Sequence, residues 1–280
     1  GGNTTASYNT GLGENALLTN TTGASNTAVG NSALYANTTA ANNTAVGTSA
    51  LAANTTGDLN TAVGKGAGAA NTTGARNTFV GAGVATSNTT GNYNTGVGGA
   101  GSDNYNVLNN NISGAQLTAV GTGTLARNTT GIDNTALGAY ALNKNTTASN
   151  NTAVGRSALT ANTTGAYNTA VGDKAGLSVT TGNYNTLIGA VAGDAITTGT
   201  ANVAIGVSAL TTDTLGGNSV AVGMQALMNQ NFTSTTSVYN TAVGHAAGAS
   251  VTTGVDNTLI GGLAGDAFTD ADYNVAIGAY

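Results

Sequence analysis

The sequence has no cysteine, no proline and no tryptophan, and charged residues fill only 6% of its 280 positions. Without cysteine there is neither a disulfide framework nor a thiolate metal site. Without proline and a strict three-residue glycine period, the chain is not collagen. Six basic residues against eleven acidic ones give a net charge of −5, which leaves no basic patch for nucleic acid. No apolar run approaches the ~18 residues of a membrane-spanning helix.

Large apolar side chains are scarce too. Alanine supplies 50 of the hydrophobic residues, and Thr, Ala, Gly and Asn together fill 182 positions. This composition cannot fill one wide core, which argues against a two-domain enzyme of ordinary build.

What the chain does contain is a repeat. A Gly that follows Asn-Thr-Ala-Val, or a close variant, recurs sixteen times, and thirteen of the fifteen intervals are 17 residues. Numbered from its Asn, the unit reads Asn-Thr-Ala-Val-Gly-x-x-Ala-Leu-x-x-Asn-Thr-Thr-Gly-x-x, and residues are placed below by unit position 1 to 17. We predict one continuous array over residues 1–280, with loop insertions between Gly98 and Leu117 and between Gly223 and Asn240.

Unit positions 2 to 4 predict a short β-strand. Position 2 is always Thr or Val, and position 4 is Val, Ile or Leu in all sixteen units, so β-branched and aliphatic residues stand two apart. The invariant Gly at position 5 suits a corner with positive φ or a close backbone approach. A helix is disfavoured because Gly, Asn and Thr are weak helix formers.

The predicted fold class is all-β, a parallel β-solenoid of about sixteen 17-residue coils stacked about 4.8 Å apart. Identical residues then form ladders, and an Asn ladder at position 1 can satisfy buried amides from coil to coil. The missing proline agrees with this fold, since every coil must donate backbone hydrogen bonds. Representative ladder residues are Asn26, Asn43, Asn60, Val29, Val46, Val63, Gly30, Gly47 and Gly64.

Position 9 is usually Leu and position 12 usually Asn, but in four units position 9 is Gly and position 12 is apolar. We interpret this exchange as two side chains that can fill the same core space. Gly68 and Ala85 lack such a partner, so their two coils are expected to be underpacked. The four exchanged pairs are Gly176 with Val179, Gly193 with Ile196, Gly248 with Val251, and Gly265 with Phe268.

The strand is apolar on both faces, because position 3 carries Ala in eleven units and Gly or a larger apolar residue in the others. A strand with one side in water should alternate with polar residues. We therefore expect positions 2 and 4 to face the core and position 3 to contact another chain, with Phe79, Leu187 and Leu259 as candidate interface residues. The alternative is that position 3 stands in solvent.

The stretch 218–223, Asn-Ser-Val-Ala-Val-Gly, resembles the head repeat of trimeric autotransporter adhesins, whose consensus is N-S-V-A-I-G, and 202–206 and 274–278 resemble it closely too. The commoner form, as at 26–30, is similar to repeats of phage tail fibres. The adhesin resemblance implies a left-handed parallel β-roll in a homotrimer that bacteria display for attachment. The 17-residue period is longer than that of the adhesin heads, which predicts a longer corner or a third side.

Residues for catalysis or metal binding are few. His245 is the only histidine, and at position 6 we interpret it as a surface residue rather than part of a Ser-His-Asp triad. Asp266, Asp270 and Asp272 are close enough in sequence to hold Ca²⁺ at a coil edge, but solvated acids are the favoured interpretation. We expect no catalytic, cofactor or metal site, and no enzyme.

Three polar or aromatic columns have both a functional and a structural interpretation. Asn-x-Thr strings match the N-glycosylation pattern, yet glycans on coils ~5 Å apart would collide, so turn-forming Asn ladders are favoured. The Thr row at position 13 can be interpreted as ice-binding, and the Tyr residues that precede position 1 can stack on sugars or flank the Asn ladder. The acceptors are Asn20, Asn37, Asn54, Asn71, Asn88, Asn128, Asn145 and Asn162; the Thr row is Thr21, Thr38, Thr55, Thr72 and Thr89; the tyrosines are Tyr8, Tyr93, Tyr167, Tyr184, Tyr239 and Tyr273.

We expect an extracellular, homotrimeric, structural and adhesive fibre segment at a bacterial cell surface or on a virion. It would form a stiff rod that carries or presents attachment to a host-surface or glycan receptor, and adhesin, filament and phage tail fibre stay open. The alternative is a solenoid module that binds glycan or ice. Neither end of the sequence has a polar cap, so we also expect a longer array or end-to-end stacking into a filament.

Overall fold

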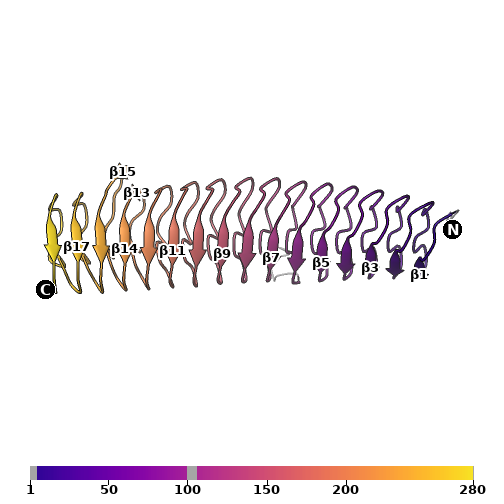
Figure 1. Ribbon diagram of the computed structural model, residues 1–280, viewed down its shortest axis with the longest axis horizontal. Helices are drawn as coiled ribbons and strands as arrows, with labels where there is room; N and C mark the ends of the chain where they lie inside the picture. The colour runs from indigo at the N-terminus through magenta and orange to yellow at the C-terminus, as the bar shows by residue number, and fades with distance from the viewer. Residues whose placement is uncertain (1–4, 100–105, 280) are drawn as a thin grey trace. The chain divides into compact units, whose positions relative to one another are not determined.

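The computed structural model describes residues 5–99 and 106–279. Every regular element among these residues is a β-strand, which confirms the all-β class. The chain forms a parallel β-solenoid in which each 17-residue unit makes one coil (Figure 1). Residues 1–147 and 148–280 form two compact parts of the chain. They are called the first unit and the second unit from here on, as distinct from the 17-residue coils that each contains, and each is described by itself.

The first unit contains eight strands that follow one another in chain order in a parallel sheet. Each strand occupies positions 2 to 4 of its coil and pairs with the same positions of the next coil, as where Thr27 lies opposite Thr44 and, across the first insertion, Thr95 lies opposite Thr118. Residues 100–105 of the first predicted insertion lie outside the described residues. The strands are β1 (Thr10–Leu12), β2 (Thr27–Val29), β3 (Thr44–Val46), β4 (Thr61–Val63), β5 (Thr78–Val80), β6 (Thr95–Val97), β7 (Thr118–Val120) and β8 (Thr135–Leu137).

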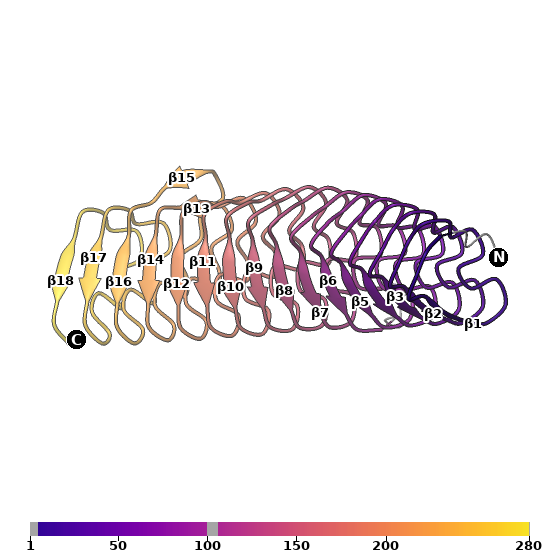
Figure 2. The same ribbon diagram turned by 45° about the vertical axis from the view of Figure 1, so that its right-hand side comes forward.

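The second unit repeats this arrangement with eight more strands. Its loop insertion carries a short extra strand, β15 (Thr236–Ser237), which pairs with β13 (Gly216–Gly217) and stands beyond the line of the coils (Figure 2). The other strands are β9 (Thr152–Val154), β10 (Thr169–Val171), β11 (Thr186–Ile188), β12 (Val203–Ile205), β14 (Val220–Val222), β16 (Thr241–Val243), β17 (Thr258–Ile260) and β18 (Val275–Ile277).

The strands face the opposite way from the expectation. Position 3 is the inward position, and positions 2 and 4 point away from the coil interior. Phe79, Leu187 and Leu259, expected to contact another chain, are fully buried inside their own coils, so that prediction was wrong. The interior is narrow and already holds Leu at position 9 and Asn at positions 1 and 12, so most coils have room only for Ala at position 3. Thr and Val favour a strand whether or not they are buried.

Residues at position 3 and position 9 share the core. Leu at position 9 is fully buried in most coils, as at Leu34 and Leu159. A Cβ on Gly193 would lie 2.7 Å from Leu187 Cδ2 and 2.8 Å from Ile196 Cδ1, which confirms that position 12 can fill the space of a missing Leu. The expected underpacking at Gly68 was wrong, because Phe79 at position 3 fills that space. The underpacking at Ala85, which is fully buried, stays a prediction.

Two columns of buried Asn join consecutive coils. At position 1, the backbone N–H of Asn43 donates to Oδ1 of Asn26 at 2.9 Å, and that of Asn60 donates to Oδ1 of Asn43 at 2.8 Å. At position 12, the Asn37 side-chain amide donates to Oδ1 of Asn20 at 2.8 Å. All these side chains are buried, so the predicted ladder through Asn26, Asn43 and Asn60 is confirmed.

The position 5 corner needs glycine. Gly30, Gly47 and Gly64 have φ of 132°, 134° and 137°. A Cβ on Gly30 would lie 2.6 Å from the carbonyl carbon of Gly47 in the next coil, closer than any side-chain atom can approach. Both predicted reasons for glycine, the positive φ and the close backbone approach, therefore hold here.

Candidate functional site

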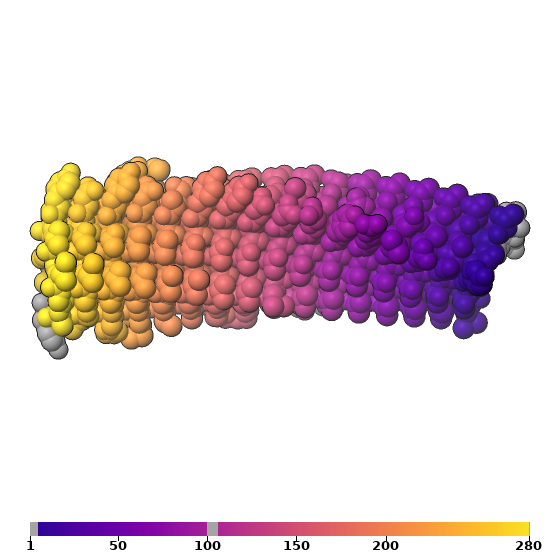
Figure 3. Space-filling view, viewed as in Figure 1, coloured from indigo at the N-terminus to yellow at the C-terminus, as the bar shows by residue number. Residues whose placement is uncertain are grey.

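The outward side chains of positions 2 and 4 form the first candidate surface, which we call the strand face. It carries only Thr, Val, Ile and Leu and no charged residue. Figure 3 shows its side chains as close-set rows within each unit. Aliphatic side chains remain more than a third exposed in the middle of both units, as at Val63 (38%) and Ile188 (36%). The ladder residues Val29, Val46 and Val63 belong to this face and are stacked in register.

Two Thr columns differ in what their hydroxyls do. At position 13, the Thr38 hydroxyl donates to the carbonyl of Thr55, and the Thr55 hydroxyl donates to the carbonyl of Thr72, both at 3.1 Å. This row, for which ice binding was the alternative interpretation, is therefore engaged in coil-to-coil bonding. Among the described residues, the position 2 hydroxyls, such as those of Thr27 and Thr44, make no hydrogen bond within the chain. The free Thr array is the one on the strand face.

Position 17 forms the second candidate surface, the tyrosine edge. Its tyrosines are more than half exposed, from 54% at Tyr93 to 89% at Tyr8. The rings of Tyr167 and Tyr184, in consecutive coils, stack with centroids 5.2 Å apart and an interplanar angle of 9°. In the first unit, Arg76 lies over the Tyr93 ring at 5.3 Å and donates a hydrogen bond to its hydroxyl.

The tyrosine edge has an unusual backbone. Every position 17 residue has a positive φ, between 55° for Tyr239 and 62° for Tyr8. Large side chains rarely adopt this left-handed conformation, which suits Gly and Asn better. Sequence reasoning missed it, although Asn or Asp stands at this position in five coils and those residue types favour positive φ.

The asparagines of the Asn-x-Thr strings at position 12 point into the coils. Asn37, Asn54 and Asn71 are fully buried, and their amides donate both to the neighbouring coil and to the position 15 carbonyl of their own coil, as from Asn54 to Gly57 at 3.0 Å. The ladder interpretation of this column is confirmed. These side chains are closed to modification in the folded chain.

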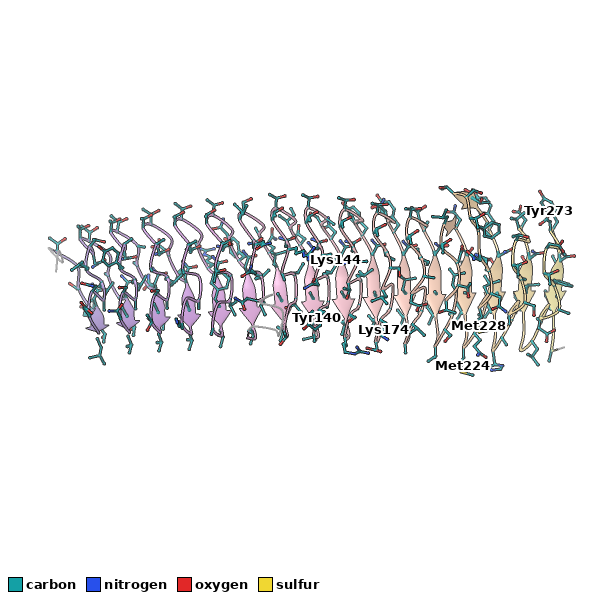
Figure 4. The ribbon with its side chains drawn as sticks, turned by 180° about the vertical axis from the view of Figure 1, so that it is seen from behind. Tyr140, Lys144, Lys174, Met224, Met228 and Tyr273 are labelled. Atoms are coloured by element: carbon teal, nitrogen blue, oxygen red, sulfur yellow. The ribbon has the colours of Figure 1, made fainter. Side chains whose placement is uncertain are left out.

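The remaining polar candidates do not form a site. His245 is exposed at position 6, the same position that Met224 occupies in the preceding coil. Met224 projects from the edge of the coils that follows the strands, and Tyr273 lies at the opposite edge (Figure 4). Asp270 and Asp272 are exposed, and the described residues contain no cluster of His, Cys, Asp and Glu suited to a metal ion. No pocket is present in the described part of the chain.

No family model matches the chain, and no curated protein matches it. Within residues 5–99 and 106–279, no helix has the length and apolar character to cross a bilayer.

Proposed function

We propose that this chain is a segment of an extracellular fibre, a stiff solenoid that carries or presents an attachment function at a bacterial cell surface or on a virion. The observation that supports it best is the register within each unit, where the coils bond to one another through their strands and turns and, in most coils, through buried Asn. Such stacking resists bending and protease attack, because opening one coil breaks bonds to both neighbours.

The proposed fibre is a homotrimer, and its chains contact one another through the strand face. An uncharged face that leaves aliphatic side chains exposed is typical of a surface covered by protein. Eight three-residue strands cover about 400 Å² in each unit, the size of a surface patch that is often functional. This face replaces position 3 as the candidate interface, since position 3 is occupied by the chain's own core.

Two measurements test this proposal. Multi-angle light scattering at micromolar concentration is expected to give a mass of about three chains of 26.8 kDa. Negative-stain microscopy of the native material is expected to show unbranched rods attached to a cell or a virion. A monodisperse 26.8 kDa species with a well-ordered far-UV spectrum would refute the trimer.

Ice binding is the second candidate, favoured by the free position 2 hydroxyls that alternate with aliphatic side chains at position 4. A flat sheet with one Thr per coil offers hydroxyls at a regular spacing of about 4.8 Å. This function needs an exposed strand face, so it excludes the trimer. Inhibition of ice recrystallisation by a monomeric protein, lost on Thr61→Lys but not on Thr56→Lys, would favour ice over the fibre.

A further inference from the structure

The stack of Tyr167 and Tyr184 ends at an open ring face in the second unit. The next coil places Ala201 at position 17 and Thr200 at position 16, and both are exposed. The coil after that places Asn218 at position 17, where its amide donates to Ser237 of β15 at 3.3 Å. Tyr184, Thr200, Ala201 and Asn218 thus stand around a place where the small side chain of Ala201 interrupts the column of larger side chains. We call this place the Ala201 slot, and it lies beside the protruding β13–β15 pair (Figure 2).

Burial and backbone preference do not account for Tyr at this edge, and the ring contact that holds Tyr184 is the stack on Tyr167. Tyr184 has a φ of 60°, where Asn or Gly would be less strained. Its side chain is 62% exposed, so it gains little from burial. An exposed aromatic ring held at a strained position has the features of a contact surface rather than of a core residue.

The slot has the width of one ring. Tyr184 and Asn218 stand two coils apart, which corresponds to about 9.6 Å at the strand spacing. A ring in contact on both sides needs about 7–8 Å between the flanking atoms. Ala201 does not fill this space, whereas a larger residue at the same position would extend the stack.

The surroundings of the slot are polar and uncharged. Residues 182–184, 199–201 and 216–218 include no Asp, Glu, Lys, Arg or His. Within the described chain, the Thr200 hydroxyl and the Asn218 Oδ1 form no hydrogen bond, so both are available to a ligand. An aromatic face beside neutral donors and acceptors suits a ligand with one apolar ring face and a rim of hydroxyls.

We propose that the Ala201 slot binds a neutral pyranose unit of a glycan, with the apolar face of the sugar on Tyr184 and its hydroxyls on Thr200 and Asn218. This rests on the attachment role proposed above and places its receptor contact on the tyrosine edge, away from the strand face. The open, shallow shape predicts weak binding per site, with affinity gained by repetition of the slot across the chains of one fibre.

The test uses the full chain and two probes, methyl β-D-glucopyranoside and methyl β-D-galactopyranoside. Sorbitol is the control ligand, because it has hydroxyls without a rigid ring face. Saturation-transfer NMR and Tyr fluorescence report binding, and the absence of Trp keeps the fluorescence signal simple. We expect millimolar binding of at least one pyranoside and none of sorbitol.

The decisive variant is Ala201→Tyr, which fills the slot with a residue that the two preceding coils already accept at this position. Ala201→Tyr and Tyr184→Ala are expected to weaken binding at least about tenfold, whereas Tyr184→Phe and, in the first unit, Tyr93→Ala bind as the parent does. Unchanged binding by Ala201→Tyr, equal binding of sorbitol, or no binding of either pyranoside would overturn the proposal. A trimer that persists in light scattering alongside any of these results would leave the fibre proposal standing.

Discussion

The Phe79 ring occupies the space that Gly68 leaves empty in the preceding coil. A Cβ on Gly68 would lie 2.8 Å from Cδ2 of Phe79 and 3.0 Å from Cδ2 of Leu51. The same relation recurs twice: small residues at position 9 come in consecutive coils, and the second coil of each pair has a large residue at position 3, Leu187 or Leu259. One large side chain at position 3 therefore reaches the space of two missing leucines, as Leu187 does beside Gly176 and Gly193, where the apolar residue at position 12 fills the rest.

This relation predicts a compensated double substitution. Phe79→Ala alone should destabilise the first unit by about 3–5 kcal/mol through the cavity, and Gly68→Leu alone by about 1–3 kcal/mol through overpacking. The double variant restores the Ala-and-Leu pairing of most coils, and Leu tolerates the backbone there, since Leu51 has a φ of 49°. Urea unfolding should therefore show a double variant more stable than Phe79→Ala. Strictly additive losses would contradict the shared space.

The strands and ladders were predictable because each residue column repeats every 17 residues. The Thr-Ala-Val pattern gave the strand, and the invariant Asn at position 1 gave the ladder through Asn26 and Asn43. The facing of the strand was not predictable from hydrophobicity, because Ala at position 3 and Val at position 4 are both apolar. The sequence does contain a signal for the facing: where the side chain at position 9 is small, as at Gly68, the side chain at position 3 of the next coil is large, as at Phe79. This inverse relation in side-chain size could have shown that position 3 points into the coil interior.

The backbone of the turns was not predictable either. Positions 7, 9 and 17 adopt positive φ, as in Ser32 (57°), Leu34 (49°) and Tyr184 (60°). None of these residue types favours that conformation, so the local sequence points elsewhere. Coil stacking overrides the preference, because each turn hydrogen-bonds to the adjacent coil, as from Leu34 N–H to Ala50 at 3.0 Å. The Ala201 slot depends on the conformation of these turns, so it could not be predicted from the sequence.

Substitutions at two adjacent residues of β11 should separate folding from the proposed assembly. Leu187 is fully buried, whereas Ile188 is 36% exposed on the strand face. Leu187→Asp is expected to unfold its coils, because an unpaired charge cannot be buried in this core. Ile188→Asp should leave the chain folded, shown by circular dichroism, and shift light scattering towards the monomer. A folded trimer of Ile188→Asp would place the interface elsewhere.

The position 1 ladder should contribute measurably to stability. Asn60 accepts the backbone N–H of Asn77 at 2.9 Å and donates to the carbonyls of Gly74 and Gly57 at 2.8 and 3.2 Å. Asn60→Ala leaves these buried groups unpaired and should cost at least about 2 kcal/mol in chemical denaturation. The control Asn31→Ala removes an exposed amide and should stay within about 0.5 kcal/mol. Equal effects of the two variants would mean that the ladder adds no stability.

Exposure, rather than the acceptor pattern, should decide which asparagines can be glycosylated. Asn37 and Asn54 match Asn-x-Thr but are fully buried. Asn42 and Asn150 match it as Asn-Asn-Thr, and both are exposed at position 17. The folded chain, incubated with an oligosaccharyltransferase and its lipid-linked donor, is expected to gain glycan only at exposed sites such as these two, because the enzyme must reach the side-chain amide.

The control is the unfolded chain, which should be modified at the buried sites as well. Mass spectrometry of tryptic and chymotryptic peptides distinguishes the buried sites from the exposed ones. Modification of Asn37 or Asn54 under native conditions, where the chain is folded on average, would show that the coils open far more readily than their hydrogen bonding implies.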